Sequence, residues 1–121
     1  MTVRLNALTP MLQSSDLQRT IDWYVSVLGF TCTSRRSDDW CRLERDKAAV
    51  MFMRNAHLGS PQATATQYIQ LDGVMELWES IRHQVTPEWG PERMPYGMLE
   101  FAIKDPDGYL LSFGQPVAGA G

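Results

Sequence analysis

The sequence predicts an α+β fold made of two βαβββ modules, and three observations lead to this prediction. The chain has 121 residues, which is enough for one ordinary domain. In each half, a strand-like segment is followed by a segment of helical periodicity and then by three more strand-like segments. The halves also end alike, with WCRLE, a turn and AAVMFM in the first and MLEFAIK, a turn and YLLSFGQ in the second. Neither half alone has much core, so we expect the two to form one domain over residues 1–121.

The first module covers residues 5–54 and opens with a moderately apolar strand at 5–13. Ser15, with Gln18 three residues later, forms a capping-box pattern that indicates the start of a helix. The apolar face of this helix is made by Leu17, Ile21, Tyr24 and Leu28. Gly29 then ends the helix. Three β-prone segments complete the module, at residues 30–35, 40–44 and 48–53.

A small, polar linker is predicted at residues 55–65, which contain Gly59 and Pro61. The second module then covers residues 66–116 and begins with a strand at 66–71. Asp72 is the expected cap of the second helix. The buried stripe of that helix is predicted to be Val74, Leu77 or Trp78, Ile81 and Val85.

The remainder of the second module is predicted to be an edge strand and a hairpin. Residues 85–95 contain three prolines, which suits an edge strand and a loop. Strands at 97–104 and 109–115 flank DPDG at 105–108, a sequence typical of a tight turn.

Composition excludes some classes of function. The formal net charge is −3 and no basic patch is visible, so a nucleic-acid partner is not expected. No apolar run reaches the roughly 18 residues of a membrane helix, and the N-terminus has no signal-peptide pattern. We therefore expect a cytoplasmic protein with no membrane partner, in which Cys32 and Cys41 are free thiols.

Two motifs carry a resemblance to a known family. DLQRTIDWYVSVLGF at 16–30 and DPDGYLLSFGQ at 105–115 together resemble the vicinal-oxygen-chelate superfamily. That superfamily includes glyoxalase I, extradiol dioxygenases, fosfomycin resistance enzymes and bleomycin resistance proteins. The resemblance covers about residues 5–116. It implies paired βαβββ modules whose curved mixed sheets enclose a cavity, and it implies a homodimer.

In metal-dependent members of the glyoxalase type, four strands each supply a metal ligand. The resemblance assigns these positions to Thr9, Phe52, Thr66 (or Gln67 after a shift of one residue) and Ser112. Zn and Ni prefer imidazole, thiolate or carboxylate ligands, so hydroxyls are poor substitutes and Phe cannot ligate. The two histidines, His57 and His83, lie in the predicted linker and late in the second predicted helix. We therefore expect neither a metal nor another cofactor.

The resemblance, combined with the alternation of side chains along a strand, gives a predicted ligand-binding set. Its members are Thr9, Met11, Trp40, Arg42, Phe52, Thr66, Tyr68, Trp89, Glu100 and Ser112. This set combines apolar walls with a few polar groups, as small-molecule sites do. An aromatic ligand could stack on Trp40 or Tyr68, and a cation could sit over these rings or against Glu100.

Simpler roles stay open for several of these residues. Trp40 could pack in a dimer interface, and Phe52 could fill a vestigial cavity. Glu100 could form a structural ion pair with Arg42. Trp89 could close over a ligand or anchor an edge.

The sequence therefore predicts a metal-free protein that binds a small molecule, by antibiotic or toxic-compound sequestration of the bleomycin-resistance type. Catalysis is not expected, although Glu100 could act as a general base if burial raised its pKa. The alternative is an enzyme of the same superfamily, such as a lyase, isomerase or dioxygenase with shifted or no metal ligands. A third possibility is a dimerisation module that binds nothing.

Overall fold

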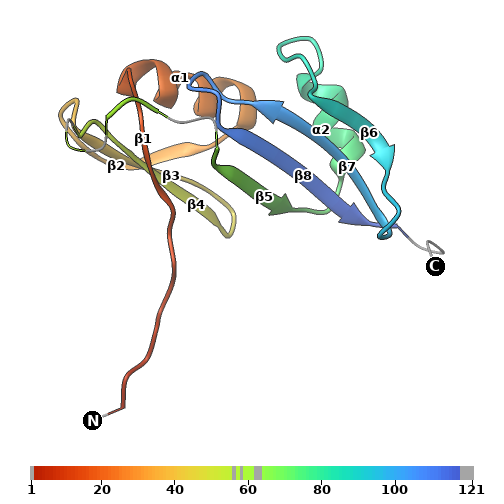
Figure 1. Ribbon diagram of the computed structural model, residues 1–121, viewed down its shortest axis with the longest axis horizontal. Coiled ribbons are helices and arrows are strands. Elements are labelled where there is room, and N and C mark those ends of the chain that lie inside the picture. Colours follow the sequence, from red (N-terminus) through yellow and green to blue (C-terminus); the bar gives the residue numbers. More distant parts are fainter. Residues whose placement is uncertain (1, 56, 58, 62–63, 118–121) are drawn as a thin grey trace. The chain divides into compact units, whose positions relative to one another are not determined.

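The computed structural model describes residues 2–55, 57, 59–61 and 64–117 (Figure 1). Within these residues the chain forms eight strands and two helices, and the order βαβββ occurs twice. Each repeat builds one mixed four-stranded sheet with one helix. This confirms the predicted α+β fold of paired modules. The chain divides into two compact units, residues 1–61 and 62–121, and the division falls inside the predicted linker.

The first unit contains one sheet in the strand order β1-β4-β3-β2. Its elements are β1 (Met11–Gln13), α1 (Leu17–Leu28), β2 (Thr31–Arg36), β3 (Trp40–Arg45) and β4 (Ala48–Met53). β1 runs parallel to β4, and the other pairs are antiparallel. The predicted apolar stripe of α1 is buried, and its Tyr24 ring packs on Phe52 of β4 with centroids 5.0 Å apart. This contact places Phe52 in the core between the helix and the sheet.

Asp16 caps the N-terminus of α1, one residue later than predicted. Its side chain accepts a hydrogen bond of 3.0 Å from the backbone N–H of Arg19. The predicted cap, Ser15, instead accepts a 2.8 Å hydrogen bond from the Arg19 guanidinium. The predicted stop is confirmed, because Gly29 takes a left-handed conformation with φ of 71° that favours glycine.

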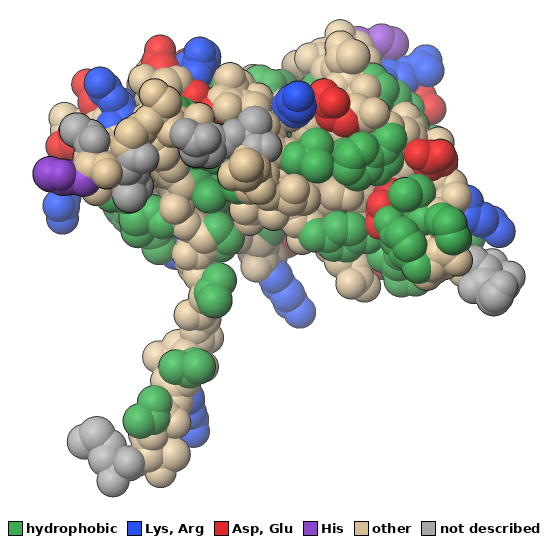
Figure 2. Space-filling view, in the orientation of Figure 1, with side chains coloured by type: hydrophobic (Ala, Val, Ile, Leu, Met, Phe, Trp, Pro, Cys, Tyr) green, Lys and Arg blue, Asp and Glu red, His purple; other side chains and the backbone are tan. Residues whose placement is uncertain are grey.

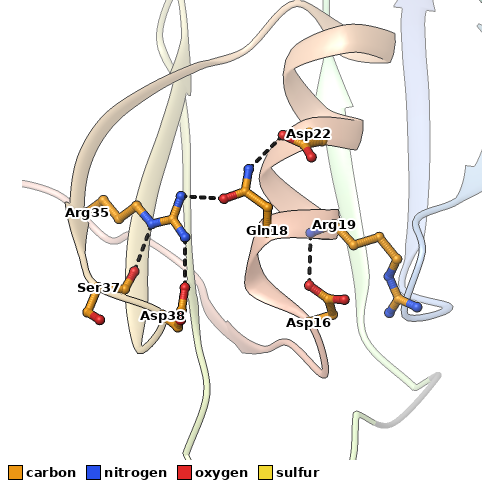
Figure 3. Close-up of polar contacts among 7 residues, drawn as sticks. All are labelled: Asp16, Gln18, Arg19, Asp22, Arg35, Ser37 and Asp38. Atoms are coloured by element: carbon orange, nitrogen blue, oxygen red, sulfur yellow. Dashed lines mark hydrogen bonds and ion pairs between the residues drawn. The ribbon is translucent and has the colours of Figure 1, made fainter.

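A polar network ties the turn between β2 and β3 to α1 (Figure 3). Arg35 donates to the Ser37 carbonyl oxygen at 2.7 Å and to Asp38 at 3.0 Å. It also donates to Gln18 of α1 at 2.8 Å, and Gln18 in turn donates to Asp22 at 2.8 Å. The acidic turn that includes Asp38 is thus exposed and linked to the helix by one arginine.

The first strand is shorter than predicted. β1 begins at Met11, and residues 2–10 form no helix or strand, because ladder pairing with β4 covers only residues 11–13. In Figure 1 this segment extends away from the first sheet. It leaves Val3, Leu5 and Leu8 84%, 91% and 90% exposed.

The second unit contains one sheet in the strand order β5-β8-β7-β6. Its elements are β5 (Thr66–Gln70), α2 (Val74–Ile81), β6 (Trp89–Arg93), β7 (Met98–Lys104) and β8 (Leu110–Pro116). β5 runs parallel to β8, and β6 is the predicted edge strand. Phe101 stacks on Phe113 with ring centroids 4.9 Å apart, and it packs against the tilted ring of Trp78 of α2 at 5.2 Å. These rings form the core under the helix.

The N-terminus of α2 is capped from a strand rather than by the predicted Asp72. The cap residue is Gly73, and the Gln115 side chain of β8 accepts hydrogen bonds from the N–H groups of Gly73 (3.2 Å) and Val74 (2.9 Å). The helix ends at Ile81, so Val85 lies outside it. No helix in the part of the chain that the structure describes is long and apolar enough to cross a membrane.

The predicted DPDG turn is confirmed. Asp105 accepts hydrogen bonds from the N–H groups of Asp107 (2.9 Å) and Tyr109 (3.0 Å). Gly108 has a φ of 89°, a conformation that side chains rarely adopt. The turn therefore fixes the register of β7 against β8.

Candidate functional site

The open face of the second sheet, defined as the side opposite α2, holds most of the polar candidates. Phe101 and Phe113 point toward the helix, so their strand neighbours point away from it. Strand register then aligns one row across all four strands, made of Trp89, Ala102, Ser112 and Tyr68. A second row contains Glu92, Glu100, Gly114 and Gln70. The predicted orientations of Tyr68, Glu100 and Ser112 are thus correct with respect to the helix.

Glu100 is the centre of a buried polar cluster on this face. It is only 1% exposed, and each of its carboxylate oxygens accepts a hydrogen bond from a tyrosine hydroxyl. The Tyr68 hydroxyl lies 2.7 Å from Oε2, and the Tyr96 hydroxyl lies 2.6 Å from Oε1. We call these three residues the Tyr68–Glu100–Tyr96 cluster. Figure 2 shows apolar side chains gathered over β7 and β8 with acidic side chains among them.

Gly114 makes room for this arrangement. Tyr68 pairs with Ser112, one row away from Glu100, so its side chain reaches Glu100 diagonally across β8. A Cβ atom at Gly114 would overlap the Tyr68 hydroxyl oxygen and lie 2.8 Å from the ring carbon Cζ. Only glycine at this position lets the phenol pass over β8 to the carboxylate.

The cluster raises the pKa of both phenol groups. Burial of the hydroxyl, its hydrogen bond to Glu100 and the negative charge of that carboxylate raise the pKa of Tyr68 to about 12. The hydrogen bond to Glu100 is the main cause that raises the pKa of Tyr96. Both hydroxyls therefore stay protonated at neutral pH and act as donors to Glu100.

The other two predicted residues of the second unit differ in their surroundings. Thr66, at the start of β5, is exposed. Trp89 is half-buried on the edge strand, and its indole N–H is buried without a hydrogen-bond partner among the described residues. Trp89, a member of the row that contains Ser112 and Tyr68, therefore carries a buried donor with no acceptor among the described residues.

The open face of the first sheet, opposite α1, is richer in apolar groups. Register aligns Met11, Met51 and Arg42 in one row and Gln13, Met53 and Trp40 in the next. Methionine side chains adapt their shape to irregular or aromatic partners. The Arg42 guanidinium lies 3.5 Å from the Glu44 carboxylate of the same strand. The sequence left open an ion pair between Arg42 and Glu100, but each of these two residues has a polar partner within its own unit. Thr9 lies two residues before β1 and is half-buried.

The predicted position of Phe52 on this open face is wrong. Phe52 is 0% exposed and packs on Tyr24 of α1, so it points toward the helix. The internal repeat gives the correct register. Met11 in the first module corresponds to Tyr68 in the second, and Met11 pairs with Met51 as Tyr68 pairs with Ser112. The residue equivalent to Ser112 is therefore Met51, one position before Phe52.

The residues at the four family metal positions do not fit a metal. With the corrected register they are Thr9, Met51, Thr66 and Ser112. Three hydroxyls and a thioether form a poor ligand set for Zn or Ni. No cluster of three or more His, Cys, Asp or Glu side chains suited to a metal occurs among the described residues. His57 and His83 are both exposed.

Two residues of this site were not predicted. Tyr96 lies in the turn between β6 and β7, where no strand or helix periodicity reports the direction of a side chain. Gly114 lies inside β8, and a glycine inside a strand often marks a close approach of another group. That signal was available in the sequence.

A surface depression lined by Met75, Glu76, Glu79 and Ser80 of α2 contains none of the predicted residues.

Comparison with known proteins assigns the fold to a family. The profile of the Glyoxalase/Bleomycin resistance protein/Dioxygenase superfamily matches residues 4–113, and the chain belongs to this superfamily. No curated protein matches the chain.

Among solved structures, similar ones include a bleomycin resistance determinant encoded on the transposon Tn5, with 25% identity and a TM-score of 0.76 over 93% of this chain and 98% of the other. A bleomycin-binding protein complexed with bleomycin has 25% identity and a TM-score of 0.72 over 92% of this chain and 98% of the other. The bleomycin-binding protein of Streptomyces verticillus has 21% identity and a TM-score of 0.72 over 98% of this chain and 99% of the other. The two structures at 25% identity support a place in the bleomycin-resistance-like branch of the superfamily, and the third shows the shared fold.

Proposed function

We propose that the protein binds a small aromatic or cationic molecule without a metal, and that it acts by sequestration in the manner of a bleomycin resistance protein. The observation that carries the proposal is the Tyr68–Glu100–Tyr96 cluster, in which a buried carboxylate lies between two partly exposed aromatic rings. Similarity to the bleomycin-bound protein over nearly the whole chain supports the same conclusion.

The chemistry of the remaining predicted residues suits binding. Trp40 on the first sheet and Trp89 and Tyr68 on the second offer aromatic contact area. Arg42 and Thr66 offer polar contacts that could orient a ligand, whereas Ser112 is only 3% exposed. Small-molecule sites in proteins hold drug-sized ligands through apolar contact and a few polar groups of these types.

Binding is favoured over turnover by the side chains that are present. The four family metal positions lack good ligands, so metal-assisted chemistry has no supporting donor set. Both carboxylate oxygens of Glu100 already accept tyrosine hydrogen bonds, which disfavours Glu100 as a general base. An enzyme of the same superfamily remains the alternative, and it would reveal itself by consumption of the bound compound.

We propose further that the protein is a cytoplasmic homodimer. Support comes from the segment before β1, where Val3, Leu5 and Leu8 are 84–91% exposed. Such a row of apolar side chains is stabilised by burial against another surface. Deletion of residues 2–8 is expected to raise the dimer dissociation constant at least tenfold in sedimentation equilibrium, and an unchanged constant would remove this support.

Thermal unfolding with a panel of compounds tests the proposed function. The panel holds divalent metals, bleomycin, aromatic amines and glutathione adducts. A compound present at about 100 times its dissociation constant adds roughly 2.7 kcal/mol to the unfolding free energy, which is readily measured. We expect stabilisation by bleomycin or aromatic amines in the presence of a chelator. Stabilisation by a metal alone would favour the enzyme.

A further inference from the structure

The charge balance of the Tyr68–Glu100–Tyr96 cluster points to the class of its ligand. Glu100 is 1% exposed, and its hydrogen-bond donors within the described residues are neutral hydroxyls. Among the ion pairs of the described part of the chain, none involves Glu100. A buried carboxylate is costly without a positive partner, because neutral donors offset only part of its lost hydration.

The surroundings of Glu100 add negative rather than positive charge. Glu92 of β6 pairs in register with Glu100 of β7 and is exposed. Its charge is also among the causes that raise the pKa of Tyr96, which indicates that it lies close to the cluster. An approaching cation would therefore meet the exposed Glu92 carboxylate and be attracted in addition by the buried negative charge of Glu100.

The two tyrosines present groups that recognise a cation with N–H donors. Tyr68 is 50% exposed and Tyr96 is 63% exposed, although both hydroxyl hydrogens are directed at Glu100. Each phenol oxygen keeps a lone pair that can accept a hydrogen bond from outside. The exposed ring faces attract cations through their quadrupole. Donation to Glu100 polarises both phenols and strengthens them as acceptors.

We propose that the Tyr68–Glu100–Tyr96 cluster is the recognition site for a protonated amine on the ligand. The ammonium group donates to the phenol oxygens, contacts the ring faces and supplies the positive charge that Glu100 lacks. This inference rests on the proposed function, since it names the chemical class of the compound that is bound. It predicts the affinity order primary ammonium, then quaternary ammonium, then neutral isostere, because a quaternary ammonium has charge but no N–H donor.

The test compares 1-naphthylmethylammonium with the neutral 1-naphthalenemethanol by calorimetric titration at pH 7, with bleomycin as a third ligand. The variants are Glu100→Gln, which removes the charge, and Tyr96→Phe, which removes one phenol oxygen and keeps the ring. Glu44→Gln, on the open face of the first sheet, is the matched control. Circular dichroism establishes that each variant is folded, and Tyr96→Phe keeps the test decisive if Glu100→Gln does not fold, because Tyr96 is largely exposed.

We expect the ammonium to bind the wild type at least tenfold more tightly than the alcohol. Glu100→Gln is expected to remove that preference, Tyr96→Phe to weaken it about threefold, and Glu44→Gln to leave it unchanged. Equal binding of the two probes by the wild type, or a preference that survives both cluster variants, would overturn the inference while bleomycin binding upholds the proposed function. If the wild type binds neither probe nor bleomycin, the proposed function fails together with the inference.

Discussion

The substitution Gly114→Ala tests the geometry of the cluster most sharply. A methyl group at residue 114 would overlap the Tyr68 hydroxyl and lie 2.8 Å from its Cζ atom, so the ring must move away from Glu100. Loss of a hydrogen bond to a charged group costs about 1.5–3 kcal/mol. Alanine in place of glycine at an unstrained position stabilises by about 0.4–1 kcal/mol through the unfolded chain. The difference predicts a net loss of about 0.5–2.6 kcal/mol of unfolding free energy.

The same substitution should change sign when Tyr68 is absent. In a Tyr68→Ala background the nearest remaining side-chain atom is Met98 Cε at 3.2 Å from the added Cβ, and a flexible methionine end can move. Gly114→Ala is then expected to stabilise by about 0.4–1 kcal/mol. Urea unfolding of the four proteins, followed by tryptophan fluorescence, measures the coupling. A Gly114→Ala variant that is as stable as the wild type would refute the position of Tyr68 over Gly114.

Three further predictions follow from burial and protonation. Cys41 is 0% exposed, and its burial raises the pKa of its thiol to about 11, so a thiol reagent should modify only Cys32 in the folded protein; rapid modification of two thiols would contradict this. The pKa of Tyr68 rises from 10.0 to about 12 on folding, so the folded state retains a proton that the unfolded state releases, and the unfolding free energy should fall between pH 10 and 12. The unfolding free energy of the Tyr68→Phe variant should fall less steeply over that pH range, and identical slopes for the two proteins would show that Tyr68 is not the group responsible. Phe52→Ala should lose about 3–5 kcal/mol of stability because it empties the core under α1, whereas Met51→Ala on the opposite face should lose far less; equal losses in urea unfolding would place both on one face.

Much of the fold could be predicted because its signals are local. The helical stripe of α1 and the turn at DPDG each follow from residues within one short segment. The bounds of β4 were predicted as they occur, at residues 48–53. The face toward which each of its side chains points was not predicted correctly. Every side chain of AAVMFM is apolar, so the alternation that distinguishes the two faces is missing. Phe52 was therefore assigned to the wrong face.

The features that could not be predicted depend on contacts between distant residues. Gln115 caps α2 from more than 40 positions away, so the nearby Asp72 was the natural expectation from sequence. Tyr96 reaches Glu100 from a turn, where side-chain direction follows no period. Glu100 was predicted as a site residue from the resemblance and the alternation along its strand, but its contact with Tyr68 depends on the register of β5, β7 and β8. The ligand-binding roles of the predicted residues stay predictions until a ligand is bound.

The central claim is that this chain binds its ligand without a metal and without converting it. Calorimetric titration of the protein with metal-free bleomycin in the presence of a chelator tests that claim directly, provided that the compound is then recovered and chromatographed. The account predicts saturable binding, with the compound recovered unchanged after prolonged incubation. Binding that requires added Ni, Zn, Mn or Fe, or a compound recovered in altered form, would contradict it and favour an enzyme of the same superfamily.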